Sequence, residues 1–551
     1  MTSWAGSPPT SCPASPEHAV PVQNTGGHVN DAEVIVVGGG HNGLICGSYL
    51  SRSGIDTLLL ESRPDVGGCT STVSDLGARF NICHCDHTLI RAMPISDELS
   101  LADHGLRYLE PGAGAIFAFH DGGEPWAVFH DAEQTVDGLA ASYPHQVNAY
   151  RRYLRDAMPV AELVIAMAGT VPSARRFAGV ALRRGGRGMA RLLDWSRSSA
   201  SEVLGRYFDD WHLSMPGITV GPSVWGLPPG MPGTGLAAIN YASRHLVRSG
   251  RPVGGSGALT DSLRASMEAA GGRVRCDSRV ERLIVDDGRV AGVRLTDGTS
   301  LRADVVVAAC DPARVFVDWL GDPPAAARRC VDRWRNMPIS DGYESKIDAV
   351  LTGRPTLAGG AGLAERHPDL DQLGQSMYVS PSPAEVADAH VARSEGRVAE
   401  IPTLLSDLPS VTDPTMAPGV GRHVLSLEVL FTPYSLMGGW DGSGEPERWL
   451  ELWAGMMEPG ALDLVDSWRV MTPNRYENEF TMHRGHTPSC AVTPLAAFLG
   501  RPRETTRYRT PVRGLYLSGA GTFPGAGVVG AAGRNAADAV HSDLRGTSLI
   551  R

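Results

Sequence analysis

Residues 33–43 of the chain read EVIVVGGGHNG, and this stretch decides the fold. The β-branched run at 33–37 predicts a buried parallel strand, and three glycines follow it directly. Apolar residues at helical spacing come next, until Gly54 ends the pattern. A second strand-like run over 57–60 then completes a β-α-β unit of about 30 residues.

The glycine-rich turn at 38–43 has the spacing G-x-G-x-x-G. The first glycine allows the tight turn, the second lets the backbone approach a pyrophosphate, and the third lets helix and strand pack closely. Glu61 ends the second strand about 20 residues further on, where an acidic side chain binds ribose hydroxyls and disfavours a 2′-phosphate. A glycine-rich turn without a nucleotide is the alternative, but the complete context favours dinucleotide binding. The predicted contacts are Gly38, Gly40, His41, Asn42, Gly43 and Glu61.

A second glycine pair follows the acid, in the segment SRPDVGGCTS at 62–71. Such a pair suits another close backbone approach to a long, extended cofactor, which favours FAD over NAD. The contacts that we expect here are Ser62, Arg63, Gly67, Gly68, Cys69 and Thr70.

These motifs resemble the phytoene-desaturase-like branch of the flavin amine oxidase superfamily, which includes retinol saturases. The phrase at 40–44, GHNGL, is most similar to the pyridine nucleotide-disulfide oxidoreductase domain 2 proteins. Many members of the branch have arginine after the glycine pair, whereas this chain has Cys69. The usual arginine contact to the cofactor is therefore in doubt.

The resemblance recurs twice further along the chain. The segment at 254–285 is similar to the family's middle FAD segment, in which the position of Val280 meets the adenine through its backbone. The segment at 510–530, TPVRGLYLSGAGTFPGAGVVG, matches a family strand, turn and helix start, with Phe523 where histidine is common. A glycine-rich turn that opens a helix offers N–H groups to the flavin and its phosphate arm. The resemblance implies contacts from Gly519, Gly521, Thr522, Gly527, Val528 and Val529.

The expected fold is therefore α/β, with a Rossmann-like FAD-binding domain of the GR2 type and an inserted mixed α+β substrate domain. Residues 1–30, rich in Pro, Ser and Gly, are predicted to be a disordered leader. The FAD-binding domain is assigned to 31–110, 250–330 and 465–551, and the substrate-binding domain to 111–249 and 331–464.

Composition excludes several classes of protein. A formal net charge of −10 argues against wholesale nucleic-acid binding, and no apolar run is long enough for a transmembrane helix. The nine cysteines are scattered in a chain without an export signal, so we expect reduced thiols in the cytoplasm. The sequence Cys83-His84-Cys85 is too tight for a zinc knuckle and has no second half, so no metal site is predicted.

Two candidate catalytic residues stand out. Lys346 is the one lysine in the chain and lies in a strand-like stretch; in relatives, a lysine in this region can hold a water near the flavin. A lysine on an exposed strand is the alternative. His486, with His483 nearby, precedes the C-terminal motif where relatives often carry a His-Gly pair that faces the flavin, and histidine can shuttle a proton near neutral pH. A hydrogen-bonded loop histidine is the alternative there.

Residues 175–197 contain seven arginines and one acid, interleaved with apolar residues. On an acidic protein, this segment is a candidate for peripheral membrane contact, which would suit uptake of an apolar substrate from lipid. A solvated pair of arginine-rich helices and a surface for an acidic partner protein are the alternatives.

The first functional hypothesis is an FAD-dependent dehydrogenase or desaturase that takes a hydride from a C–C or C–N bond of a largely apolar small molecule, such as a polyene or a specialised metabolite. The second is an oxygen-using flavin amine or amino-acid oxidase. The third is a flavoprotein fold retained as a non-catalytic interaction module.

Overall fold

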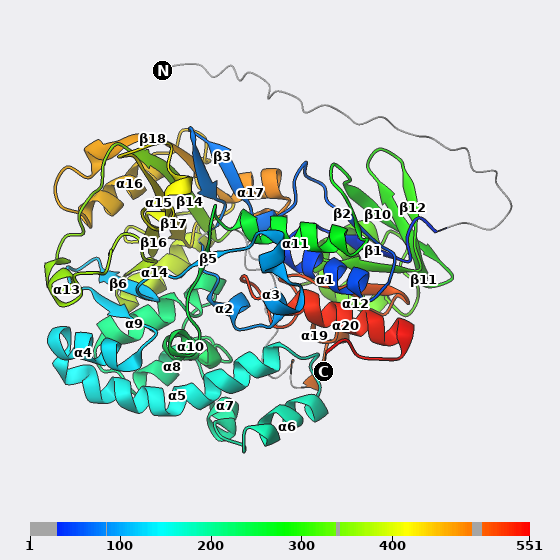
Figure 1. The fold of residues 1–551 in the computed structure, drawn as a ribbon, viewed down its shortest axis with the longest axis horizontal. Helices are drawn as coiled ribbons and strands as arrows, with labels where there is room; N and C mark the ends of the chain where they lie inside the picture. Colours follow the sequence, from blue (N-terminus) through cyan, green and yellow to red (C-terminus); the bar gives the residue numbers. More distant parts are fainter. Residues whose placement is uncertain (1–29, 84, 338–341, 487–496, 498, 551) are drawn as a thin grey trace.

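The computed structural model describes residues 30–83, 85–337, 342–486, 497 and 499–550. In Figure 1, elements from the beginning and the end of the chain, coloured blue and red, lie together in one half of the molecule. Elements from the two long middle stretches fill the other half. Most of the predicted leader lies outside the described residues.

The N-terminal unit forms as predicted, with β1 (Val34–Val37), α1 (His41–Arg52) and β2 (Thr57–Leu60). Strands β1 and β2 are parallel neighbours. Every residue of both strands is buried, as expected for a parallel sheet that is covered on both faces. Helix α1 begins immediately after Gly40, so its free N–H groups lie at the carboxyl end of β1.

Distant parts of the chain complete this parallel sheet. The added strands are β9 (Arg273–Arg275), β13 (Val305–Ala308) and β19 (Leu515–Leu517). The order is β19-β13-β1-β2-β9, and every pairing is parallel. The predicted α/β class with a Rossmann-like sheet is therefore confirmed.

The described residues also form three small antiparallel sheets. One joins β10 (Val280–Asp286), β11 (Arg289–Leu295) and β12 (Ser300–Arg302). The other two are the hairpin of β3 (Thr72–Asp75) with β4 (Ala78–Asn81), and β5 (Tyr108–Leu109) with β8 (Arg251–Pro252).

The other half of the molecule contains a seven-stranded mixed sheet, in the order β18-β14-β17-β16-β15-β6-β7. Its strands are β6 (Ala115–Phe119), β7 (Trp126–Val128), β14 (Glu344–Leu351), β15 (Met377–Ser380), β16 (Leu404–Asp407), β17 (His423–Leu430) and β18 (Val465–Met471). Strand β18 pairs with β14, although its residues belong to the stretch that the sequence assigned to the cofactor domain. The domain boundaries themselves stay a prediction.

The helices fall into two groups. Those between the first hairpin and β8 are α2 (Thr88–Arg91), α3 (Ile95–Glu98), α4 (Ala132–Ser142), α5 (Val147–Ala168), α6 (Ala174–Arg183), α7 (Met189–Trp195), α8 (Ala200–Gly205), α9 (Trp211–Thr219) and α10 (Asn240–Leu246). Those that follow β8 are α11 (Gly257–Ala269), α12 (Arg328–Arg335), α13 (Ala361–Arg366), α14 (Pro383–Ser394), α15 (Pro409–Thr412), α16 (Glu445–Gly455), α17 (Pro473–Phe480), α19 (Arg503–Thr506) and α20 (Ala531–Arg545).

The stretch 188–206 contains two separate helices. Helix α7 ends at Trp195, and Ser199 then caps α8. The Ser199 hydroxyl accepts from the backbone N–H of Glu202, whose carboxylate in turn accepts from the Ser199 N–H. This capping box fixes a new helix start, which the pattern of apolar residues did not reveal.

Helix α1 packs against both α11 and α20, and glycines allow the close approach. A Cβ atom at Gly533 of α20 would lie 2.3 Å from the carbonyl oxygen of Asn42. The Gly533 N–H also donates to the side-chain oxygen of Asn42, at 3.2 Å. The first and last helices of the parallel-sheet half are thus held against each other by a backbone contact and a hydrogen bond.

Aromatic side chains fill the core between α5, α10 and the edge of the seven-stranded sheet. Tyr150, Tyr153 and Tyr241 are fully buried, with ring centroids 5.8 to 6.0 Å apart. Their hydroxyls reach His245 Nε2 and the carbonyl oxygens of two neighbouring helical segments. Buried tyrosines with satisfied hydroxyls make a rigid core, so this part of the molecule serves as a fixed scaffold.

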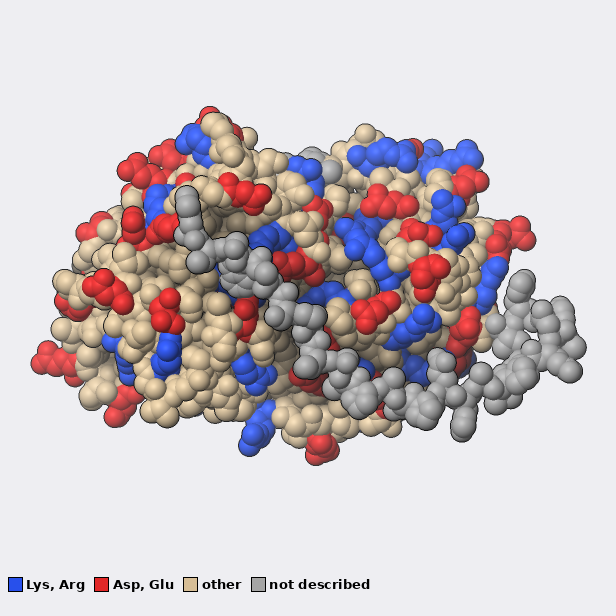
Figure 2. Space-filling model, turned by 90° about the horizontal axis from the view of Figure 1, so that it is seen from above, with Lys and Arg blue, Asp and Glu red and all other residues tan. Residues whose placement is uncertain are grey.

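Charges are mixed on the face seen from above in Figure 2, where arginines and acids are interspersed and no wide basic surface forms. No helix in the described part of the chain combines the length and the apolar character that a membrane crossing requires.

The contact at Gly533 leads to a stability prediction. Replacing Gly533 with alanine should lower the free energy of unfolding by about 1–3 kcal/mol, because the new methyl group must displace the backbone of α1. Thermal unfolding should show a Tm several degrees below that of the unmodified protein.

The matched control is Gly179→Ala in α6, where an added Cβ meets no atom within 4 Å. Its Tm should equal or slightly exceed that of the unmodified protein, because alanine favours a helix. Equal Tm values for Gly533→Ala and the unmodified protein would contradict the packing argument.

Candidate functional site

A deep cleft lies at the carboxyl ends of β1, β2, β13 and β19, where open α/β sheets bind their ligands. It contains about 1220 Å³ of space not filled by protein atoms, part of it open to solvent. Both predicted glycine turns line this one cleft, although the sequence separates them by nearly the whole chain. The predicted residues that line it are Gly38, Gly40, His41, Asn42, Gly43, Glu61, Ser62, Arg63, Gly67, Gly68, Cys69, Val280, His486, Gly519 and Gly521.

The first glycine turn admits no side chain at its two outer positions. Gly38 has φ +109°, and a Cβ there would lie 2.8 Å from the carbonyl oxygen of Ala309 on the neighbouring strand segment. A Cβ at Gly43 would lie only 1.9 Å from the carbonyl oxygen of Gly38. Helix α1 can therefore begin directly on the end of β1, with uncapped N–H groups toward the cleft.

Glu61 lies buried at the end of β2, as the motif predicts. One carboxylate oxygen accepts from the N–H of Gly39 at 2.7 Å, and the other accepts from the N–H of Arg63 at 2.9 Å. The backbone of Glu61 also pairs with Ser278, which draws the middle segment with Val280 into the cleft. The acid therefore stabilises the glycine turn while its remaining lone pairs can meet ribose hydroxyls.

His41 is a neutral, oriented side chain. Burial lowers its pKa to about 4, although a hydrogen bond to the backbone of Gly527 opposes this shift. The amide of Asn42 donates to His41 Nε2, and His41 Nδ1 lies 3.0 Å from the hydroxyl of Thr70. Because the Asn42 oxygen accepts from Gly533, its amide nitrogen must face the imidazole, so the ring proton lies on Nδ1. His41 thus connects the two glycine turns.

The C-terminal turn packs on the same segment as the first turn. Gly519 has φ +90°, and its Cβ position is 3.3 Å from the carbonyl carbon of Ala309. The buried hydroxyl of Thr522 donates to the carbonyl oxygen of Gly519 and so closes the turn. Five predicted contacts do not line the cleft itself: Thr70, Thr522, Gly527, Val528 and Val529. Thr70 and Gly527 instead position His41, so their proposed contact with the cofactor stays a prediction.

Sequence reasoning missed a third contribution to the cleft, from the segment that follows β13. Cys310, Asp311 and Arg314 line the cleft beside Ala309, as does Trp319. The signal was present, because these residues follow the apolar run at 305–308, and ligand contacts gather where parallel strands end. Other residues that were not predicted are Ser278, Arg279, Ala520, Phe480, Thr481 and Met482.

The lining fits a dinucleotide. Arg314 Nε is buried and has no hydrogen-bond partner among the described residues, and the N-terminus of α1 leaves N–H groups uncapped. Both are donors suited to phosphate oxygens, while Glu61 is an acceptor suited to ribose hydroxyls. At Gly38 and Gly43 an added Cβ would lie 2.8 and 1.9 Å from backbone oxygen atoms, so only glycine fits these positions of the turn.

Sulfur and aromatic side chains line the part of the cleft beside the second glycine pair, here called the sulfur end. The Cys69 thiol donates to the sulfur of Met482 at 3.7 Å, and the guanidinium of Arg63 lies 4.1 Å from the ring centre of Phe480. Two acids line the cleft: Glu61, which follows β2, and Asp311, which follows β13. Among the described residues that line the sulfur end there is no carboxylate.

Lys346 is fully buried on β14, so the exposed-strand alternative is wrong. Its ammonium group donates to the carbonyl oxygen of Asn81 at 2.8 Å and forms an ion pair with Asp348. Asp348 also accepts from Arg469 at 2.8 Å. Lys346 does not line the cleft, and its proposed catalytic role stays a prediction.

His483 and His486 both line the sulfur end of the cleft. The ring of His486 lies edge-on to Tyr343, with centroids 6.5 Å apart. The position of His486 agrees with the requirement that a proton shuttle lie beside the substrate, while its role stays a prediction. Residues 487–496, which follow it in the chain, lie outside the described residues.

One group of side chains has the composition of a cation site. The ligand atoms of Cys83, Glu344 and Glu428 lie within 4.8 Å of one another, with both carboxylates buried. The Cys83 thiol donates to Glu344 Oε1 at 3.5 Å. His84, the middle residue of the tight cysteine pair, lies outside the described residues, and the predicted lack of a metal stays a prediction.

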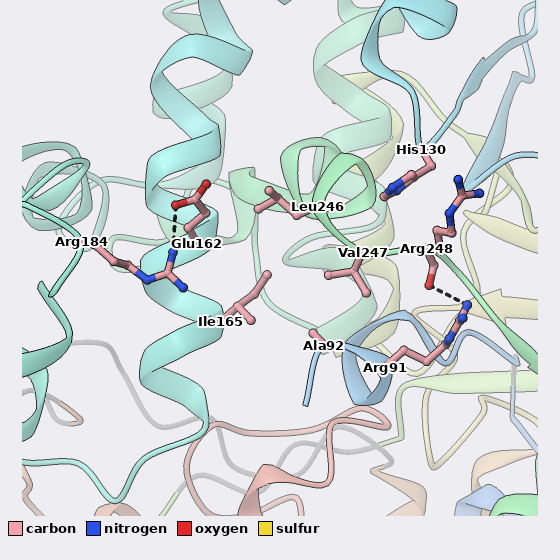
Figure 3. A pocket seen from close by; sticks show the side chains of 9 residues that line it. All are labelled: Arg91, Ala92, His130, Glu162, Ile165, Arg184, Leu246, Val247 and Arg248. Atoms are coloured by element: carbon pink, nitrogen blue, oxygen red, sulfur yellow. Dashed lines mark hydrogen bonds and ion pairs between the residues drawn. The ribbon is translucent and has the colours of Figure 1, made fainter. Parts of the chain in front are cut away.

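A second cavity, of about 860 Å³ and open to solvent, lies among α2, α5 and the end of α10. Figure 3 shows Ile165, Val247 and Ala92 around the central space, with charged side chains at the rim. At that rim Arg184 pairs with Glu162 at 2.9 Å. Arg184 belongs to the arginine-rich segment, so that segment borders an open cavity whose lining is mostly polar.

Helices α6 and α7 carry that segment at the lower edge of the molecule in Figure 1. All seven arginines between 175 and 197 are exposed. Three of them form ion pairs with acids on other elements, namely Arg176, Arg184 and Arg191. Leu182 is 79% exposed, which is unusual for a leucine of a helix that packs on a core.

Comparison with known proteins agrees with this geometry. Residues 43–340 match the family model of flavin containing amine oxidoreductases. The chain is 27% identical to pyridine nucleotide-disulfide oxidoreductase domain-containing protein 2 of Rattus norvegicus, over 93% of this chain and 94% of the relative. It is 25% identical to a limonene dehydrogenase polypeptide of Castellaniella defragrans, over 94% of this chain and 95% of the relative.

Two further similarities extend the comparison. A lycopene-forming phytoene desaturase of Pseudescherichia vulneris is 25% identical over 90% of this chain and 96% of its own length. Among solved structures, cyclohexylamine oxidase of Brevibacterium oxydans superimposes with a TM-score of 0.58 over 93% of this chain and 99% of that one, at 15% identity. The structural likeness supports the fold, and together with the family match it indicates FAD as the cofactor.

The first glycine turn provides a direct test of cofactor binding. Gly43→Ala should weaken FAD binding at least about tenfold, because a Cβ 1.9 Å from the Gly38 oxygen forces α1 away from β1. The ratio of flavin to protein absorbance in the purified variant measures the loss.

Gly205→Ala at the end of α8 is the control, because an added Cβ there meets nothing within 4 Å. It should retain a full complement of flavin. A Gly43→Ala protein that is as yellow as its parent would show that the turn does not bind the nucleotide.

Proposed function

The chain belongs to the flavin containing amine oxidoreductase family, and on that premise we propose that it is an FAD-dependent dehydrogenase or desaturase of a largely apolar small molecule. The reaction removes a hydride and a proton across a C–C or C–N bond. A polyene, a terpene or another specialised metabolite of low polarity is the substrate class.

The lining of the cleft is the observation that carries this proposal. Its sulfur end presents Cys69, Phe480 and Met482, and none of the described residues that line this end carries a carboxylate. An ammonium substrate needs an acid or an aromatic cage to replace its hydration, whereas an apolar carbon chain needs only apolar contact and the exclusion of water.

The relatives point the same way. A limonene dehydrogenase polypeptide and a phytoene desaturase match this chain over nine-tenths of its length or more. Limonene and phytoene are hydrocarbons, so the shared fold accommodates substrates without a charged group. The amine oxidases among the solved structures are only about 15% identical, and their likeness supports the fold alone.

FAD supplies the redox chemistry, since a bound flavin can accept a hydride from a substrate carbon. The residues of the chain hold and orient the reactants. Glu61 and the glycine turns fix the nucleotide, and Phe480 and Met482 exclude water from the far end of the cleft. His486 lies at that end and is our candidate for removing the proton.

We also propose that the arginine-rich segment 175–197 rests on an anionic membrane surface. Its arginines are exposed, Leu182 projects from it, and the second cavity lies beside Arg184. Each arginine near an anionic surface contributes about 1 kcal/mol to binding, so several together hold a protein at the surface.

Substrate reduction of the flavin tests the proposed reaction. Under anaerobic conditions, terpene and polyene hydrocarbons should bleach the oxidised flavin, and mass spectrometry should find products that have lost two hydrogen atoms. The flavin-free Gly43→Ala protein, incubated in the same way, should leave the hydrocarbons unchanged.

Bleaching by amines or amino acids alone, with peroxide formed on exposure to air, would replace the proposal with an oxidase. A flavin that dithionite reduces but no substrate on either panel bleaches would favour the non-catalytic module.

Membrane contact is tested by co-sedimentation with lipid vesicles. The protein should bind phosphatidylserine-containing vesicles more tightly than pure phosphatidylcholine vesicles, and added salt should weaken the binding. Reversing Arg183 and Arg187 to glutamate should reduce the affinity at least about tenfold.

The same charge reversal at Arg328 and Arg329, two exposed neighbours on α12, is the matched control and should leave binding unchanged. Equal binding to neutral and anionic vesicles, or equal losses in the two double variants, would exclude the segment as a membrane contact.

A further inference from the structure

Three arginine side chains from distant parts of the chain converge on the second cavity, and the proposed reaction does not use them. Arg91 ends α2, Arg184 follows α6, and Arg248 follows α10. Figure 3 shows Arg184 on one side of the open space and Arg248 on the other. Glu162 is the one acid among the described residues that line the cavity, so the lining has an excess of positive charge.

The wall of the cavity beside Arg91 is fixed by several contacts. The Arg91 guanidinium donates to the carbonyl oxygens of Arg248 at 3.1 Å and Ser249 at 2.6 Å. It also lies over the ring of Tyr108, 5.3 Å from the ring centre. A Cβ at Gly250 would lie 2.6 Å from Cδ of Arg91, so this glycine leaves room for the arginine side chain. A ligand would therefore meet a wall that is already ordered, which lowers the entropic cost of binding.

Acids compensate only part of the positive charge. Glu162 forms an ion pair with Arg184 at 2.9 Å, and Glu110 forms one with Arg91. The guanidinium of Arg248 lies 3.8 Å from Glu110, which is too long for a hydrogen bond. The described residues supply no other acceptor to this guanidinium, and the Arg248 side chain is 60% exposed. Its five N–H donors are thus available to a ligand.

His130 adds an acceptor on the same side of the cavity as Arg248, as Figure 3 shows. Its Nδ1 lies 3.2 Å from the carbonyl oxygen of Arg244, and because a carbonyl oxygen only accepts, Nδ1 carries a proton. In the neutral ring, Nε2 is then an acceptor, which suits the hydroxyl group of a monoprotonated phosphate. Arginines on two sides of the space suit a ligand with several acceptor oxygens, as a phosphate has.

The cavity has room for more than a phosphate group. Its space of about 860 Å³ is open to solvent, and apolar side chains form part of the lining beside the charged ones. Figure 3 shows Ile165, Val247 and Ala92 around the central space. A ligand that uses both kinds of contact joins an anionic group to a hydrocarbon part, and it can enter directly from solvent.

We propose that this cavity binds the phosphate group of an amphiphilic phosphate ester. Arg248 and Arg184 donate to the phosphate oxygens, while Ile165 and Val247 contact the hydrocarbon part. A membrane lipid with an exposed phosphate and a soluble alkyl phosphate share this chemistry. The proposal requires neither the flavin reaction nor the membrane contact of segment 175–197, so the failure of either leaves it intact.

Calorimetric titration of the holoprotein with dodecyl phosphate, below its micelle concentration, tests the site. One ligand should bind to each chain, and inorganic phosphate should compete. Arg248→Gln should weaken the affinity at least about tenfold, because hydrogen bonds to a charged group are lost. The Tm of this variant should not change, since the Arg248 side chain is 60% exposed. Arg183→Gln is the control, because Arg183 is next to Arg184 and exposed but does not line the cavity, and its affinity should equal that of the unmodified protein.

Lipid vesicles distinguish the two sources of the phosphate. Phosphatidylcholine vesicles with phosphatidic acid are compared with vesicles that contain an equal fraction of phosphatidylserine. If Arg248→Gln weakens binding to the phosphatidic acid vesicles only, the ligand is a lipid headgroup. If Arg248→Gln binds both kinds of vesicle like the unmodified protein but has lost affinity for dodecyl phosphate, the ligand is a soluble ester.

Three results would overturn the proposal. The first is no binding of dodecyl phosphate at millimolar concentration. The second is equal affinity for dodecyl phosphate and for dodecanol, because the phosphate would then not be recognised. The third is an equal loss of affinity in Arg248→Gln and Arg183→Gln, which would assign the binding to general surface charge.

Discussion

The absence of a side chain at Gly43 is the constraint on which the rest of this structure depends. A Cβ there would lie 1.9 Å from the carbonyl oxygen of Gly38, so only glycine lets α1 start on the last residues of β1. Because α1 starts there, its uncapped N–H groups lie at the cleft. The same start brings Asn42 against α20, where a Cβ at Gly533 would lie 2.3 Å from the carbonyl oxygen of Asn42. One backbone approach thus sets both the phosphate-binding turn and the docking of the C-terminal helix.

The cleft that results is chemically divided. Hydrogen-bonding groups gather where the parallel strands end, with Glu61 after β2 and Arg314 after β13. The sulfur end is formed by Cys69 and by residues 480–482, which carry sulfur and aromatic groups. Residues 480–482 belong to the segment that follows β18, a strand of the seven-stranded sheet. A dinucleotide with a polar and an aromatic end matches this division.

Buried charge in the seven-stranded sheet is a different kind of feature. Lys346, Asp348 and Arg469 form a buried ionic group in which each charge has a partner, and Lys346 also ties β14 to β4 through the carbonyl oxygen of Asn81. Removing one partner of such a group is costly, because the remaining charge stays out of water. The single lysine of the chain therefore joins the second sheet to the hairpin of β3 and β4.

The sequence by itself determined the Rossmann-like unit, the FAD turns and the family, because close backbone approach requires glycine at fixed spacings and such spacings are local. It predicted fifteen of the residues that line the cleft, from Gly38 to Gly521. Only the tertiary structure decided which distant segments meet: the burial of Lys346, the entry of Asp311 and Arg314 into the cleft, the pairing of β18 with β14, and the contact of Cys69 with Met482. These depend on strand order and register between segments far apart in the chain, and no local pattern of residues encodes that order.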